Sequence, residues 1–129
     1  MPEIQKELTR AELQIMQILW SIEKGFVNDI LVALPEPRPA YNTVSTIVRI
    51  LEKKGFVSYV AYGKTHEYFP LISKEQYTRE YVGGVVKNYF QNSFRQMLSF
   101  FANENKLSVN EIEEIRKLME EELERKKNK

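Results

Sequence analysis

Polar side chains between residues 42 and 49 carry the groups best suited to contact another molecule. Asn42, Thr46 and Arg49 recur at helical spacing, which places them on one face of a helix. An asparagine amide can form two hydrogen bonds with adenine, a threonine methyl can pack on the thymine methyl, and an arginine can reach guanine or a phosphate. This pattern predicts a helix that reads base edges, although Asn or Thr at a helix start is also expected for capping alone.

Basic residues cluster around this helix. The stretch from residue 38 to residue 66 has a local charge of +4, five cations minus one carboxylate, although the whole chain has a net charge of +1. The cations are Arg38, Arg49, Lys53, Lys54 and Lys64, and the carboxylate is Glu52. Lysine ammonium groups act as flexible point charges and suit phosphate contacts. An ordinary solvated surface can have the same composition. The predicted DNA-binding residues are Asn42, Thr43, Ser45, Thr46, Arg49, Lys53, Lys54 and Lys64.

The helices that must position these residues can be predicted from capping and helix-breaking residues and from hydrophobic periodicity. A capping box at Thr9 to Glu12 predicts the start of a first helix, which Lys24-Gly25 stops. A short second helix is expected over residues 28–34, with Asn28 as its cap, before three prolines end it. A third helix is expected over residues 42–54, with Gly55 after its end. Its buried stripe is Val44, Ile47, Val48 and Leu51.

A hairpin and further helices complete the expected order. Residues 56–62 and 67–71 are rich in β-branched and aromatic side chains and predict two strands, with Lys64 at the tip of the turn between them. His66, next to that turn, is expected to be a plain surface residue, a phosphate contact or a pH sensor. A helical tract is expected from residue 73 to about residue 103, interrupted at most at Gly83-Gly84, where a bend or close packing is expected. Ser108 is expected to cap a final helix.

The C-terminal helices carry more apolar side chains than a small domain needs for its own core. Since a monomer rarely leaves a large apolar patch exposed, self-association is expected; folding back on the first domain is the alternative. The predicted dimerisation residues are Phe90, Phe94, Met97, Leu98, Phe101, Ile112, Ile115 and Met119. The sequence thus predicts a mainly α fold with a small β-hairpin. Residues 1–72 form a winged helix-turn-helix domain and residues 73–129 form the dimerisation helices.

Several function classes have little support in the composition. The chain has no cysteine and a single histidine, so it offers no thiolate site and no all-histidine metal site, and neither a metal nor a cofactor is expected. Gly-rich phosphate loops and nucleophile motifs are also missing, which argues against an enzyme. Neither a secretory signal nor an apolar stretch long enough for a membrane span is seen, so a cytoplasmic protein without membrane insertion is expected.

Over nearly its whole length the chain resembles the penicillinase repressor (BlaI/MecI/CopY) family of bacterial regulators. The segments that carry the resemblance are Leu8-Thr9-Arg10-Ala11-Glu12 with Ile15-Met16 and Leu19-Trp20, Asn42-Thr43-Val44 through Lys53-Lys54-Gly55-Phe56, Tyr68-Phe69-Pro70-Leu71, and Leu107-Ser108 with Glu111 to Ile115. The resemblance implies a homodimeric repressor that grips a palindromic double-stranded DNA operator through two winged-helix halves. It also implies intertwined C-terminal helices as the dimerisation unit.

The β-lactam-responsive members of that family respond to a membrane sensor metallopeptidase and are cut at an Asn-Phe step. Phe100-Phe101 is the equivalent step here, and its asparagine is absent. The copper-responsive members carry a cysteine-rich motif that this chain lacks. The expected function is therefore sequence-specific repression, with signal-dependent proteolysis left open. A protein-interaction module on a winged-helix scaffold is the alternative, which salt-dependent DNA binding distinguishes from a repressor.

Overall fold

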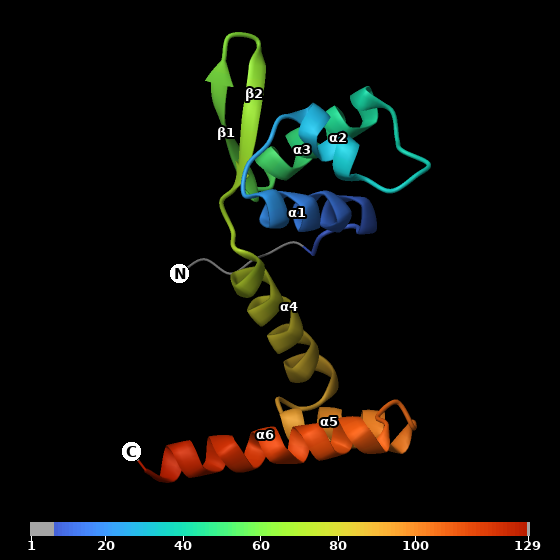
Figure 1. Cartoon of the computed structure of the whole chain (residues 1–129), viewed down its shortest axis with the longest axis vertical. Helices are drawn as coiled ribbons and strands as arrows, with labels where there is room; N and C mark the ends of the chain where they lie inside the picture. The colour runs from blue at the N-terminus through green and yellow to red at the C-terminus, as the bar shows by residue number, and fades with distance from the viewer. Residues whose placement is uncertain (1–6, 129) are drawn as a thin grey trace. The chain divides into compact units, whose positions relative to one another are not determined.

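A computed structural model describes residues 7–128, which form six helices and one antiparallel hairpin (Figure 1). The chain divides into two compact units, one ending at Val82 and the other beginning at Gly83. The first unit holds α1 (Arg10–Ile22), α2 (Val27–Ala33), α3 (Tyr41–Lys53), β1 (Val57–Tyr62) and β2 (Thr65–Pro70). Helix α4 (Lys74–Tyr89) crosses the boundary between the units. The second unit also holds α5 (Phe94–Asn103) and α6 (Val109–Lys127). The predicted mainly α fold with a small hairpin is confirmed.

Helix α1 begins with the predicted capping box. The Glu12 backbone N–H donates to the Thr9 hydroxyl at 3.2 Å, and the Thr9 N–H donates to the Glu12 carboxylate at 2.9 Å. The predicted stop at Lys24-Gly25 is wrong, because the helix ends at Ile22 and Glu23 takes the left-handed φ of 75°. Gly25 serves close packing instead, since a Cβ there would lie 2.8 Å from the Ile22 side chain.

Helix α2 starts earlier than the sequence predicts. Its N-cap is Phe26, and the Asp29 carboxylate accepts a hydrogen bond from the Phe26 N–H at 2.9 Å. The prediction of Asn28 as the cap is therefore wrong: Asn28 lies inside the first turn, and a carboxylate further along satisfies the free backbone donor at the helix start.

Helix α3 has nearly the predicted bounds. Gly55 follows it with a φ of 84°, and the Phe56 N–H donates to the Leu51 carbonyl at 2.9 Å, which is the hydrogen bond of a Schellman motif. Val44, Val48 and Leu51 are fully buried and Ile47 is half-buried, so the predicted stripe is confirmed.

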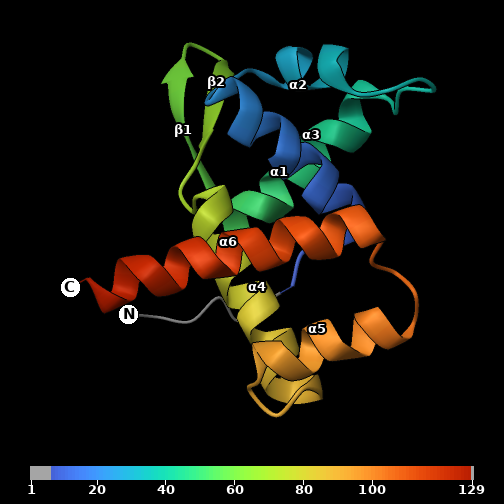
Figure 2. The ribbon, with the colours of Figure 1, turned by 60° about the horizontal axis from the view of Figure 1, so that its bottom comes forward.

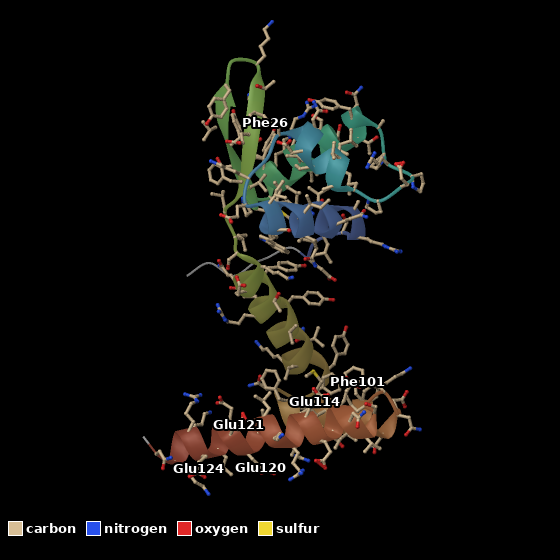
Figure 3. All side chains as sticks on the ribbon, viewed as in Figure 1. Phe26, Phe101, Glu114, Glu120, Glu121 and Glu124 are labelled. Carbon is tan, nitrogen blue, oxygen red and sulfur yellow. The ribbon has the colours of Figure 1, made fainter. Side chains whose placement is uncertain are left out.

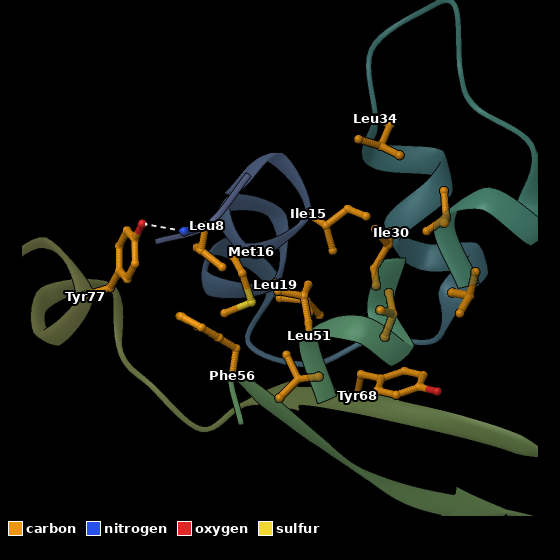
Figure 4. Packing of buried hydrophobic residues seen from close by; sticks show 14 residues of the cluster. Leu8, Ile15, Met16, Leu19, Ile30, Leu34, Leu51, Phe56, Tyr68 and Tyr77 are labelled. Atoms are coloured by element: carbon orange, nitrogen blue, oxygen red, sulfur yellow. Dashed lines mark hydrogen bonds between the residues drawn. The ribbon is translucent and has the colours of Figure 1, made fainter. Parts of the chain in front are cut away.

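One hydrophobic core holds the first unit together, and Figure 4 shows its packing. Side chains of α1, α2, α3 and the hairpin meet there, and Figure 2 shows α1, α2 and α3 lying across one another beside the hairpin. The fully buried side chains are Ile15, Met16, Leu19, Ile30, Val44, Val48, Leu51, Phe56 and Val57, with Val86 in the second unit. Trp20 packs at the edge of the core, and its indole N–H donates to the Ile72 carbonyl at 2.8 Å.

The hairpin closes with a turn of two residues. Tyr62 pairs with Thr65 across Gly63-Lys64, and Gly63 has a φ of 63°, which favours glycine. The second strand therefore begins at Thr65, two residues before the predicted start. The Thr65 hydroxyl donates to the Tyr62 carbonyl at 2.8 Å and stabilises this tighter turn.

The predicted interruption of the long helical tract is in the wrong place. Helix α4 runs straight through Gly83-Gly84 and ends at Tyr89. Gln91 and Asn92 have φ values of 52° and 60°, which a helix cannot contain, and the Ser93 hydroxyl then caps α5. The predicted capping box that starts the final helix at Ser108 is confirmed.

Candidate nucleic-acid interface

The polar face of α3 lies open to solvent. Asn42, Thr43, Thr46 and Arg49 are exposed and Ser45 is half-buried, while the opposite face of the helix is in the core. An exposed face on a helix whose other face is rigidly packed can be presented as a unit to a flat or grooved partner.

Capping does not explain the polar residues at the start of this helix. The N-cap is Ala40, and no side chain caps α3. The Thr46 hydroxyl donates to the Asn42 carbonyl at 2.8 Å, so the hydroxyl is turned inward along the helix. The Arg49 guanidinium donates to the Ser45 hydroxyl at 3.1 Å. These two hydrogen bonds restrict the side-chain conformations of Thr46 and Arg49 before any partner arrives.

A groove of about 550 Å³ separates this face from the hairpin. Its walls combine the start of α2, the exposed side of α3 and the hairpin turn. They comprise Phe26, Val27, Asn28, Asp29, Tyr41, Ser45, Arg49, Lys64, Thr65, His66 and Tyr68. Phe26 lies between α2 and the hairpin (Figure 3), and its ring centroid is 5.9 Å from that of Tyr62. The groove is thus shaped by three segments that are far apart in the sequence.

The charges lining the groove favour an anion. The cations Arg49 and Lys64 line it beside His66, and they outnumber the one carboxylate of the lining, Asp29, which accepts a hydrogen bond from the Phe26 N–H. Burial, with the nearby Glu52 carboxylate, raises the pKa of Tyr68 above the usual value of 10.0, so its phenol is even further from ionisation at neutral pH than that of an ordinary tyrosine. Hydroxyl, amide and cationic donors in this arrangement suit a phosphate of a nucleic-acid backbone.

His66 is held flat against Tyr59 on the hairpin. The two ring centroids are 3.9 Å apart with an interplanar angle of 5°. Tyr68 contacts both rings, at 5.7 Å from Tyr59 and 6.1 Å from His66. This aromatic cluster stiffens the two strands next to the turn. Lys64 lies in that turn, at the tip of the hairpin as predicted.

Two of the five predicted cations are paired with carboxylates of the chain. The Lys54 ammonium donates to the buried Glu12 carboxylate at 2.7 Å, and its side chain is only 18% exposed. Arg38 donates to the carbonyls of Leu34 and Val32 and lies 3.6 Å from a carboxylate oxygen of Glu36. The local charge counted from the sequence therefore overstates what a partner can use. Arg49, Lys53 and Lys64 are exposed, Arg38 is exposed but held by the contacts above, and Lys54 is half-buried.

Sequence reasoning did not place Asn28, Tyr41 or Thr65 at this groove. Tyr41 could have been found, since it directly precedes the polar face of α3 and is 48% exposed. Asn28 and Thr65 carried no such signal, because only the packing of α2 and the hairpin against α3 brings them to the same groove.

The second unit has a very small core of its own. Among described residues 83–128, Val86 is the single buried side chain. Of the predicted dimerisation residues, Phe90, Met97 and Ile115 are half-buried, and the exposed ones are Phe94, Leu98, Phe101, Ile112 and Met119. An apolar hollow of about 760 Å³ lies over the end of α4 and over α5. These helices lack the buried area that a unit of this size needs to be stable by itself.

Phe100 and Phe101, the predicted cleavage step, lie inside α5. Their ring centroids are 5.2 Å apart, and both rings contact Phe90, at 5.7 Å and 6.4 Å. The two side chains are 50% and 40% exposed. Figure 3 labels Phe101 of α5 and four glutamates of α6, namely Glu114, Glu120, Glu121 and Glu124. Among residues 7–128 no cluster of three or more acidic or histidine side chains could hold a metal ion.

The three helices, with α3 packed behind α2 and exposed on its far side, and the hairpin that follows define a winged helix-turn-helix protein. The penicillinase repressor family profile matches residues 8–121. The chain belongs to the penicillinase repressor family.

Similar curated proteins are repressors. The methicillin resistance regulatory protein MecI of Mammaliicoccus sciuri is 25% identical over 114 residues, which cover 88% of this chain and 93% of that protein. The penicillinase repressor of Bacillus licheniformis is 25% identical over 122 residues, which cover 94% of this chain and 95% of that protein. The solved structure described as the CopR repressor aligns with 53% of this chain and 100% of its own, at 30% identity and a TM-score of 0.44. The two curated relatives are thus named as a regulatory protein and as a repressor. Within the described range, no helix combines the length and the apolar character that a membrane span requires.

Proposed function

We propose that this chain is a sequence-specific transcriptional repressor that binds a palindromic DNA operator as a homodimer. The observation that carries the proposal is the exposed polar face of α3, with Thr46 and Arg49 already hydrogen-bonded in place beside a cationic groove. In this arrangement α3 enters the major groove, Asn42, Thr43, Thr46 and Arg49 meet base edges, and Lys53 and Lys64 meet phosphates.

The groove between α3 and the hairpin takes the DNA backbone next to the bases that α3 reads. Its donors come from Asn28, Tyr41 and Thr65 as well as from the cations Arg49 and Lys64. Lys54 is left out of the proposed interface because its ammonium is bound to Glu12.

Direct binding tests the proposal. The DNA probe is the segment upstream of the chain's own gene, and its competitor is a scrambled duplex of the same composition. Fluorescence anisotropy at several salt concentrations should show tighter binding to the first duplex and a linear fall of log affinity with log salt. A stable dimer with no salt-dependent DNA binding would instead favour the protein-interaction module.

Replacing Lys64 by alanine should weaken binding to both duplexes by a similar factor. The residue lies in the exposed turn of the hairpin and carries a point charge suited to a phosphate rather than a base. The slope of log affinity against log salt should fall by about one unit, the value for a single lost phosphate contact. Lys127→Ala, at the exposed end of α6, is the matched control and should keep the wild-type slope. An unchanged slope in both variants would remove Lys64 from the interface.

Dimerisation through the second unit follows from its lack of a core. Among its described residues, ten large apolar side chains are exposed, five of them in the predicted dimerisation set, and a second copy of the same helices supplies the surface that would cover them. A single copy of the reading helix, with few exposed cations, would bind weakly. Two linked copies gain avidity because the second contact is intramolecular.

Placing aspartate at Leu98 and Ile112 should therefore convert the dimer into a monomer. Both side chains are exposed in the single chain, at 38% and 48%, so the first unit should remain folded. Sedimentation velocity measures the change in mass, and operator affinity should fall at least about tenfold through lost avidity. Asn110→Asp, on the exposed side of α6, is the control for added charge. A double variant that stays dimeric would place the dimer interface elsewhere.

Proteolytic release is proposed only on the family resemblance. Because Phe100-Phe101 lies within α5, a protease could reach this step only after the helix has opened locally. The intact mass of the chain after co-expression with a membrane sensor metallopeptidase checks it, and an uncut chain would exclude this route.

A further inference from the structure

Two consecutive glycines lie inside α4 without any local reason to be there. Helix α4 is continuous from Lys74 to Tyr89 and contains Gly83 and Gly84. Neither has a positive φ, unlike Gly55 and Gly63. Apart from the adjacent residues and the backbone of the same helix, a Cβ built on either one would have no atom within 4 Å. Alanine would therefore fit at both positions and would make a stronger helix.

The boundary between the two compact units falls at these glycines, between Val82 and Gly83. On the N-terminal side, Tyr77 fastens α4 to the winged-helix core. Its hydroxyl accepts a hydrogen bond from the Leu8 N–H at 3.1 Å, and its ring lies 5.8 Å from Phe56 and 6.0 Å from Trp20. With 8% exposure, Tyr77 belongs to the first core.

On the C-terminal side, Val86 fastens the same helix to the second unit. Its side chain is fully buried, and its carbonyl accepts hydrogen bonds from the N–H groups of Phe90 at 3.0 Å and Asn92 at 2.9 Å. The two ends of α4 are therefore each held by a different unit. Gly83 and Gly84 lie between these two attachments, and glycine has the lowest helix propensity of any residue except proline.

We infer that Gly83-Gly84 is a hinge that lets the direction of α4 change between the winged-helix unit and the dimerisation helices. Glycine pairs are among the recognised causes of bending in helices, and hinges are short segments that absorb changes in φ and ψ. In the dimer proposed above, one hinge in each copy lets the two α3 helices meet half-sites whose separation varies. This use of the hinge depends on the proposed function, whereas the bending itself does not.

The geometry of DNA sets what the hinge must accommodate. Adding one base pair between two half-sites moves one of them by about 3.4 Å and rotates it by about 35° around the duplex. A rigid dimer matches one spacing and loses contacts at the others. A dimer with one hinge in each copy can adjust to the shift and rotation of a half-site, so it binds operators of several spacings with similar affinity.

The test uses the full-length Gly83→Ala/Gly84→Ala variant. Asn88→Ala is the matched control, because it also replaces an α4 residue by a stronger helix former but leaves the glycines in place, and Asn88 is exposed. Nitrogen-15 relaxation on DNA-free protein measures whether the two units tumble separately. The wild type and Asn88→Ala should show two tumbling times and the double variant one. Amide exchange at residues 82–86 should slow by about fivefold or more in the double variant.

The DNA arm uses a duplex that the wild-type protein selects from a random library, rebuilt with one base pair added or removed between its half-sites. Wild-type affinity should change by less than about threefold at the altered spacings. The affinity of the double variant should fall by about tenfold or more, since the contacts it loses contribute at least as much free energy as one matched base pair.

Three results would overturn the hinge: one tumbling time already in the wild type, equal spacing tolerance in the two proteins, or loss of the dimer in the double variant. The last would mean that the glycines admit a close neighbour from the second copy. If the wild type binds no DNA, the proposed function fails, and the relaxation measurement alone still decides whether α4 bends.

Discussion

Replacing Lys54 by alanine is expected to lower the free energy of unfolding by about 2–4 kcal/mol, since it leaves a buried carboxylate without its cation. Glu12 is 5% exposed, and its carboxylate accepts hydrogen bonds from the Lys54 ammonium at 2.7 Å and the Thr9 N–H at 2.9 Å. After the substitution only the Thr9 hydrogen bond compensates for burial of the charge. Chemical denaturation followed by circular dichroism measures the loss.

Lys53→Ala is the matched control, because Lys53 is the preceding lysine of the same helix and is exposed. It should change the free energy of unfolding by less than about 0.5 kcal/mol, as is usual for surface substitutions. Equal losses in the two variants would mean that the ion pair with Glu12 adds nothing beyond an ordinary surface lysine.

The same ion pair predicts a dependence of stability on pH. Burial raises the pKa of Glu12, but hydrogen bonds from Lys54 and Thr9 outweigh burial, so its pKa lies below the usual value of 4.5. A carboxyl group whose pKa is lowered on folding stabilises the fold above its unfolded pKa and loses that contribution as pH falls through the folded pKa. Wild-type stability should therefore fall on acidification below about pH 4.5, and Glu12→Gln should show a shallower fall.

Substituting both Thr46 and Arg49 by alanine is expected to weaken binding to the operator by about 100-fold, or about 3 kcal/mol, while binding to scrambled DNA weakens far less. Both side chains lie on the exposed face of α3 and are held by hydrogen bonds to the same helix. Contacts to base edges carry the sequence information, so their loss acts on the ratio of specific to non-specific affinity.

Arg125→Ala removes one arginine from α6, where it pairs with Glu122 on an exposed surface, and is the control for net charge. It should leave the specificity ratio unchanged. Competition titrations with the operator and the scrambled duplex measure that ratio. If the double variant kept the wild-type ratio, α3 would not be the reading helix.

Most of the first unit could be predicted from local signals. The capping box at Thr9 and the C-terminal glycine at Gly55 are fixed by backbone hydrogen-bonding needs that nearby residues meet. The stripe from Val44 to Leu51 follows from helical periodicity alone. The errors fell where one local signal competed with another: Asp29 satisfies the start of α2 in place of Asn28, and the interruption predicted at Gly83-Gly84 lies at Gln91-Asn92.

By itself, the sequence determined the order of the elements, the apolar and polar faces of α3 and the family resemblance, because periodicity, capping residues and turn residues act over a few positions. Only the tertiary structure decided which charges a partner can reach. Lys54 and Glu12 lie 42 positions apart, and the fold brings them into contact at 2.7 Å, whereas Arg49, Lys64 and His66 come together around one groove. Such neighbours depend on how helices and hairpin pack, and packing is a property of the whole core rather than of any local stretch.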